Sequence, residues 1–97
     1  MKVRFTEPAQ QDLVSIYDYI AQDSTRYARR MVDRITSRSK QIRTHPLSGG
    51  MVPELERPDI REVIEGPYRI IYRVLESRID VLAVVHGARL LPRNRLE

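Results

Sequence analysis

The side chains best suited to chemistry lie in the C-terminal third of this 97-residue sequence. His86 is the first candidate, because an imidazole can gain and lose a proton near neutral pH. Arginine supplies 15 of the 17 basic residues, and its planar guanidinium forms fork-like pairs with carboxylates or phosphates. A structural interpretation is also open, in which His86 ends a strand and bonds locally while Arg69 and Arg73 pair with nearby carboxylates. The candidate carboxylates are Glu62 and Glu65.

These side chains must be positioned by residues 60–91, which the pattern divides into three strands joined by two tight turns at 66–67 and 76–78. Alternation along residues 68–75 places two sets of side chains on opposite faces of a strand. One set is Tyr68, Ile70, Tyr72 and Val74, and the other is Arg69, Ile71, Arg73 and Leu75. Residues 79–85 are apolar on both faces except at Asp80, which indicates a strand in the middle of a sheet. The hairpin therefore carries arginines on one face and delivers His86 and Arg89 to its far end.

The N-terminal half predicts the layer that covers this sheet. Residues 2–6 alternate as a short strand, and Pro8 suits the first turn of a helix that should end near Asp23. Ser24 is the expected N-cap of a second helix, which should stop at residues 44–45 because Pro46 disfavours helix before it. Residues 46–59 predict a loop and residues 90–97 an irregular, frayed tail.

The predicted architecture is a single α+β domain over residues 1–97, ordered β-α-α-β-β-β. A helical hairpin packs on one face of a small sheet in two layers. The apolar stripes predict one shared core, and the pattern leaves the partner of the first strand open. The residues expected in that core are Val3, Phe5, Leu13, Ile16, Ile20, Met31, Val32, Ile35, Ile70, Tyr72, Val81 and Val85.

The charge is concentrated in one segment. Residues 26–45 hold seven basic residues against one acidic residue, a net charge of +6 in a chain of net charge +4. This segment predicts an acidic partner, either a protein or a nucleic acid. A generic nucleic-acid-binding module is one interpretation, because cations on one helix can contact phosphates. No sequence-reading helix or aromatic platform accompanies them, so this interpretation is the weakest of those considered.

Composition excludes several other classes. The absence of cysteine excludes disulfides and thiolate metal sites, and two histidines alone do not predict a metal centre. Gly49-Gly50 lacks the following lysine of a phosphate-binding loop. No cofactor or metal is therefore expected. No stretch approaches the ~20 apolar residues of a membrane span, and a cytoplasmic location is the expectation.

Four segments together resemble the ParE branch of the RelE/ParE toxin superfamily. They are PAQQDLVSIYDYIAQDS, HPLSGG, IREVIEGPYRIIYRV and IDVLAVVHGARLLP. The resemblance runs from about residue 3 to residue 92. It implies a helical hairpin on a small twisted sheet, and an acidic, amphipathic antitoxin as the partner. ParE-like members inhibit DNA gyrase and are not known to hydrolyse a substrate. RelE-like members are ribosome-dependent mRNA endoribonucleases.

The gyrase inhibitor is the preferred interpretation. RelE-type nucleases bring lysines and often a late tyrosine to their site, but the only lysines here are Lys2 and Lys40, and no tyrosine follows Tyr72. If the chain were a nuclease, its expected catalytic residues are Arg61, Arg69 and His86, with Glu62 or Glu65 as base. The expected antitoxin-binding residues are Val14, Tyr17, Tyr27, Arg30, Arg34 and Arg61. The expected target-binding residues are Arg69, Arg73, His86 and Arg89.

Overall fold

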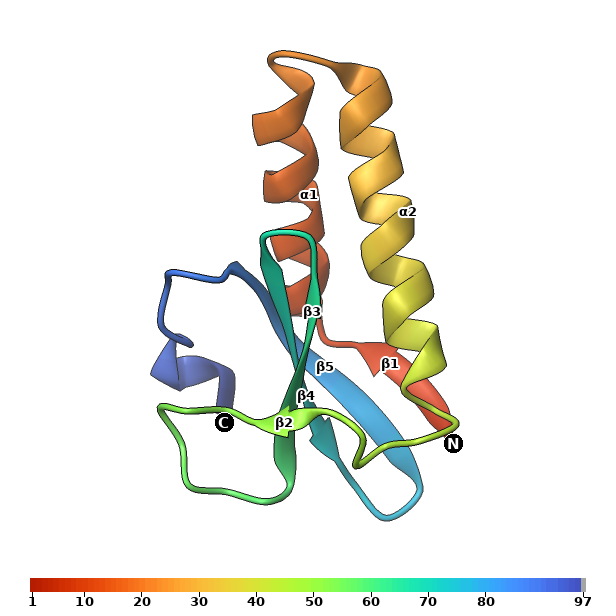
Figure 1. The fold of residues 1–97 in the computed structure, drawn as a ribbon, viewed down its shortest axis with the longest axis vertical. Helices are drawn as coiled ribbons and strands as arrows, with labels where there is room; N and C mark the ends of the chain where they lie inside the picture. The colour runs from red at the N-terminus through yellow and green to blue at the C-terminus, as the bar shows by residue number, and fades with distance from the viewer. Residues whose placement is uncertain (97) are drawn as a thin grey trace.

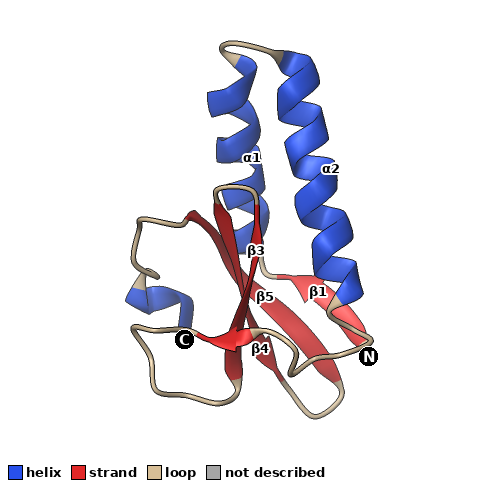
Figure 2. Cartoon of the chain, viewed as in Figure 1, coloured by secondary structure: helices blue, strands red, loops and turns tan. Residues whose placement is uncertain are grey.

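The structure is a computed structural model that describes residues 1–96. Two helices cover one face of a five-stranded mixed sheet with strand order β1-β5-β4-β3-β2 (Figures 1 and 2). The elements in chain order are β1 (Lys2–Phe5), α1 (Glu7–Ala21), α2 (Thr25–Gln41), β2 (Gly50–Met51), β3 (Ile60–Glu65), β4 (Tyr68–Val74), β5 (Arg78–His86) and the 3-10 helix η1 (Arg93–Leu96). This arrangement confirms the predicted two-layer α+β fold.

Both helices begin at a side-chain N-cap, Thr6 for α1 and Ser24 for α2, of which the sequence predicted only Ser24. The Thr6 hydroxyl accepts from the Ala9 N–H at 3.3 Å, and the Ser24 hydroxyl accepts from the Tyr27 N–H at 3.1 Å, so each satisfies a backbone donor left free at a helix start. Helix α2 ends at Gln41, a few residues earlier than predicted. Residues 42–45 instead form turns with i to i+3 backbone bonds, which tighten the end of the helix before Pro46.

Strand β5 is an interior strand, paired on both sides, as its apolar sequence predicts. It pairs antiparallel with β4 on one side and parallel with β1 on the other, with Val3 opposite Ile79. This pairing supplies the partner of β1 that the pattern left open. Strand β2 was not predicted, because two residues, Gly50 and Met51, are too few to show a period.

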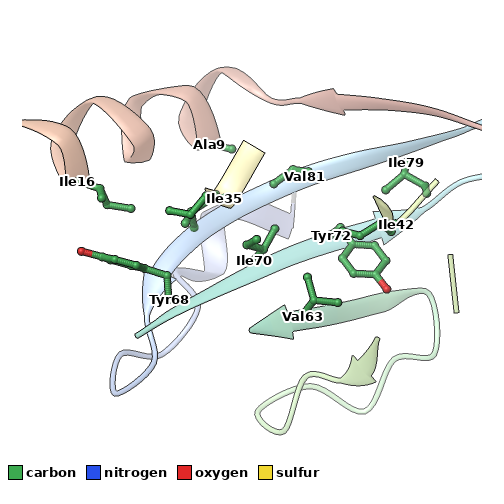
Figure 3. Packing of buried hydrophobic residues seen from close by; sticks show 11 residues of the cluster. Ala9, Ile16, Ile35, Ile42, Val63, Tyr68, Ile70, Tyr72, Ile79 and Val81 are labelled. Carbon is green, nitrogen blue, oxygen red and sulfur yellow. The ribbon is translucent and has the colours of Figure 1, made fainter. Parts of the chain in front are cut away.

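The prediction of one core is wrong in part, because apolar side chains pack on both faces of the sheet. Under the helices, Ile16, Ile35, Ile70, Tyr72 and Val81 are buried together (Figure 3). Val3, Phe5, Leu13, Ile20 and Met31 are partly buried against them. Val32 is only partly buried and belongs to neither cluster, and Val85 packs on the other face.

The second cluster is built from strand residues and from two irregular segments. It contains Val52, Ile60, Ile71, Leu82, Ala83 and Leu91, with Leu55, Val85 and Leu96 packed against it. A bulge where β4 pairs with β5, at Ile71/Tyr72, lets the consecutive Leu82 and Ala83 both join it. The loop after β2 and the C-terminal tail therefore cover this face, which corrects the prediction of a frayed tail.

The segment that leads into β2 is held against Tyr72 by a close approach that only glycine permits. The Tyr72 hydroxyl accepts from the Gly49 N–H at 3.2 Å and donates to the Pro46 carbonyl at 2.8 Å. A Cβ on Gly49 would lie 2.6 Å from the Glu62 carbonyl oxygen and would also strike the Tyr72 hydroxyl. A Cβ on Gly50 would meet nothing within 4 Å.

Gly49→Ala is therefore expected to lower the free energy of unfolding by about 1–3 kcal/mol, the usual range for overpacking. Gly50→Ala is the matched control and should change it by less than about 0.5 kcal/mol. The urea midpoint of each variant measures the difference. Equal midpoints for the two variants would contradict the close approach at Gly49.

Candidate functional site

Arg69 of β4 is the centre of a buried ion network. Its side chain is 8% exposed. The Nε donates to Glu62 Oε1 at 2.9 Å, and Nη2 donates to Glu62 Oε1 at 2.8 Å and to Glu54 Oε1 at 2.6 Å. The Nη1 donates to Glu54 Oε2 at 3.1 Å and to the Arg89 carbonyl at 2.8 Å. A guanidinium has five N–H donors, so this arrangement leaves Arg69 no donor for a phosphate.

This network joins three segments of the chain. Glu54 comes from the loop after β2, Glu62 from β3, and the Arg89 carbonyl from the start of the tail. Glu54 also accepts from the Leu91 N–H at 2.9 Å. The structural interpretation of Arg69 predicted the pairing with Glu62 but missed Glu54, which lies in a loop without periodicity.

The other predicted pairings differ from those observed. Glu65 bonds to Arg34 of α2 at 2.6 Å rather than to a strand arginine. Arg73 donates to the Leu96 carbonyl at 2.7 Å and lies 3.9 Å from Asp59. Both strand arginines thus hold irregular segments against the sheet, Arg69 the start of the tail and Arg73 its end.

The network makes stability dependent on pH. Hydrogen bonds from Arg69, opposed by burial and helped by the Leu91 N–H, lower the pKa of Glu54 from 4.5 to about 2. A lowered carboxyl pKa stabilises the fold above pH 4.5, and that contribution is lost as the pH falls through about 2. At ~1.4 kcal/mol per pH unit it amounts to about 3 kcal/mol at most, and solvent screening reduces it because the Glu54 side chain is 19% exposed.

We therefore expect urea midpoints of the wild type to fall between about pH 4.5 and pH 2 more steeply than those of Glu54→Gln, because glutamine does not titrate. Comparing the two slopes removes the contribution of the other carboxyls. Parallel slopes across this window would show that Glu54 is not held by Arg69 in solution.

His86 stands at the end of β5, on the face that carries the helices. It lies opposite Tyr68 in the β4–β5 register, and the two rings meet edge to face with centroids 5.9 Å apart. Its Nδ1 accepts from the Ala88 N–H at 3.5 Å, the local bond that the structural interpretation predicted. A cleft of about 600 Å³ opens here, lined in part by Tyr19, Tyr68, His86, Arg89 and Leu90.

The residues proposed for a nuclease do not converge. Arg69 follows Tyr68 on β4 and projects into the second face, opposite to His86. Arg61 lies opposite Tyr72, whereas His86 lies opposite Tyr68. Tyr72 is four residues from Tyr68 along β4, so the two pairs are about 13 Å apart at ~3.3 Å per residue. The Arg61 side chain donates to the carbonyls of Pro58 at 2.9 Å and Gly49 at 3.3 Å.

The four residues predicted to bind the target are likewise divided. Arg69 and Arg73 are engaged on the second face, whereas the His86 and Arg89 side chains are exposed at the end of β5. Only this exposed pair is placed to contact another molecule without rearrangement. Sequence reasoning could not separate the pairs, because the register that sets their faces is not visible in composition.

Most residues predicted to bind an antitoxin lie on the surface. Val14, Tyr27, Arg30 and Arg34 are exposed, and Tyr17 and Arg61 are partly buried. Further exposed apolar side chains, which the sequence patterns did not single out, are Met1, Tyr19, Leu47, Met51, Ile64 and Leu90. Tyr19 lies off the apolar stripe of α1 just as Val14 and Tyr17 do, so the same criterion would have found it.

Residues 1–96 contain no group of three or more histidine or acidic side chains that could hold a metal ion. Within the same residues, no helix is long and apolar enough to cross a membrane. The surface features that could contact another molecule are the cleft at His86, the exposed apolar side chains and the basic face of α2.

Two helices on one face of a five-stranded mixed sheet are also the fold of solved structures from bacterial toxin–antitoxin systems. The fold is similar to a structure of the chromosomal ParDE toxin–antitoxin system from P. aeruginosa, with TM-score 0.73 and 26% identity over 89% of this chain and 95% of that chain. It is also similar in fold to the RelBE2 toxin–antitoxin complex from Mycobacterium tuberculosis, with TM-score 0.66 and 22% identity over 88% and 95%.

Sequence comparison identifies the family within this class. The family model for the ParE toxin of the parDE type II toxin–antitoxin system matches residues 3–91. A relative named Toxin RelE2, from Caulobacter vibrioides, is 33% identical over 90 residues, which are 92% of this chain and 98% of the relative. The chain therefore belongs to the ParE toxin family and is the toxin of a type II toxin–antitoxin system, in the ParE/RelE superfamily.

Proposed function

We propose that this toxin acts in the cytoplasm by binding and inhibiting DNA gyrase, and that a cognate acidic ParD-like antitoxin neutralises it. The observation that carries the proposal is the dispersal of the side chains a ribonuclease would need. Arg69 spends all five donors on protein acceptors, and it faces away from His86. A binding inhibitor needs a shaped and charged surface rather than an assembled acid, base and phosphate clamp.

The second candidate is a RelE-like mRNA endoribonuclease. It is favoured by the name of the relative from Caulobacter vibrioides, Toxin RelE2, and by the exposed His86 beside Arg89 in one cleft. In this alternative His86 would protonate the leaving group, and Arg89 would replace Arg69 as the phosphate contact.

Induced expression with two readouts tests the proposal. A gyrase inhibitor should induce the SOS response before translation slows, whereas a ribonuclease should stop translation first. The purified toxin should also inhibit supercoiling by gyrase and leave mRNA intact in a translating extract. Cleaved mRNA with unaffected supercoiling would overturn the proposal.

We further expect the antitoxin to associate under electrostatic steering, with Val14, Tyr17 and Tyr27 as apolar anchors and Arg30, Arg34 and Arg61 at the charged rim. Charges at a rim change the rate of association more than the rate of dissociation. Raising the salt concentration should therefore slow association, measured by stopped-flow fluorescence, well before it speeds dissociation. An association rate independent of salt would show that these arginines do not steer the antitoxin.

A further inference from the structure

Four arginines of α2 recur at every fourth position. We call Arg26, Arg30, Arg34 and Arg38 the arginine row. Residues four apart are neighbours on a helix surface, so the row follows one inclined line along α2 and spans about 18 Å at ~1.5 Å per residue. With Arg29 and with Glu65 of β3 it lines a groove of about 710 Å³.

The row has few counter-charges within the chain. Its groove holds five arginines against two carboxylates, Asp33 and Glu65. Arg34 pairs with Glu65 at 2.6 Å, but the other four arginines form no ion pair within residues 1–96. Like charges four residues apart destabilise a helix by ~0.2–0.5 kcal/mol per pair. Apart from the Arg34–Glu65 pair, the row is therefore left without counter-charges in the isolated chain, and an anionic partner would supply them.

The remaining residues of the groove indicate what kind of anion fits. They are Thr25, Ser37 and Gln41, and no apolar side chain lines the groove. A protein partner would need apolar or aromatic anchors at the centre of its interface, and a single-stranded nucleic acid would need stacking platforms. Within the groove itself, arginine, hydroxyl and amide side chains are present without either, and these are side chains that contact the phosphates of a double helix.

We propose that the arginine row binds the phosphate backbone of duplex DNA without reading its sequence. The choice of DNA over duplex RNA rests on the proposed function, because gyrase acts on duplex DNA. Four or five arginine contacts predict that log K falls with log salt concentration with a slope of about −4, at ~0.9 per phosphate. Since Arg30 and Arg34 are also predicted to contact the antitoxin, DNA and antitoxin should compete for this face.

The test uses the full-length chain and a fluorescein-labelled DNA duplex of about 20 base pairs and arbitrary sequence, followed by anisotropy between about 50 and 200 mM salt. The double variant Arg30→Gln/Arg38→Gln should bind more weakly, and its slope should fall to about −2. Arg57→Gln/Arg93→Gln removes the same charge from exposed positions outside α2 and should keep a slope near −4. Circular dichroism confirms that both variants fold.

Several outcomes would overturn the inference. Equal losses in the two double variants would assign binding to net charge rather than to the row. Tighter binding of a duplex RNA, or of a polyglutamate peptide that depends on the row, would assign the groove to another partner. Gyrase inhibition without DNA binding would contradict DNA binding by the row but leave the proposed function standing. DNA binding through the row without gyrase inhibition would support DNA binding by the row and contradict the proposed function.

Discussion

Replacing Arg69 with methionine is expected to lower the free energy of unfolding by about 3–5 kcal/mol. Methionine fills a similar volume but leaves Glu54 and Glu62 partly buried without their cation, and removing one partner of a buried ion pair typically costs this much. The stability of a small domain is only about 5–15 kcal/mol, so the variant should approach the limit of folding. The loop after β2 and the tail should loosen together, because Arg69 holds both.

Urea unfolding measures the loss, and hydrogen exchange shows where it occurs. Arg57→Met is the matched control, because Arg57 pairs with Asp59 on the surface, with side chains 46% and 40% exposed. Exposed pairs contribute only about 0–1 kcal/mol. If Arg69→Met cost no more than the control, the network would not hold the second face together. Glu54→Gln in both backgrounds then gives the coupling between Glu54 and Arg69.

The elements with a regular period could be predicted from the sequence, and the irregular ones could not. The stripe through Leu13, Ile16 and Ile20 and the cap at Ser24 are local, so helix positions follow from neighbouring residues. The tail and the loop after β2 pack through contacts between residues far apart in sequence. Nothing local distinguishes Leu91, which is buried, from Leu90, which is exposed.

The candidate site depended on register, which short-range patterns do not determine. Alternation correctly places Tyr68 and Arg69 on opposite faces of β4. Whether His86 shares the face of Tyr68 depends on how β4 and β5 align, and a slip of one residue would reverse it. The bulge at Ile71/Tyr72 adds such an offset within the pair. The sequence therefore identified the reactive side chains but not which of them lie close together in the fold.

His86→Gln separates the two proposed activities by the largest factor. Glutamine keeps a similar size and can accept the bond from the Ala88 N–H, but it cannot act as a general acid. Loss of a general acid typically costs a factor of ~10²–10⁴ in rate. If the toxin inhibits gyrase by binding, toxicity should stay within a few-fold of the wild type. If it is a ribonuclease that uses His86, toxicity should vanish.

Arg89→Gln is the informative companion to His86→Gln. The Arg89 side chain is exposed, and its backbone carbonyl still accepts from Arg69 after the substitution, so the fold should be kept. A gyrase-binding surface should lose more from removal of this charge than from His86→Gln, whereas a nuclease should lose most with the histidine. Both variants must first be shown to fold and to bind the antitoxin. A folded, antitoxin-binding His86→Gln toxin without toxicity would reverse the ranking, because glutamine keeps a similar size and the local hydrogen bond but cannot transfer a proton.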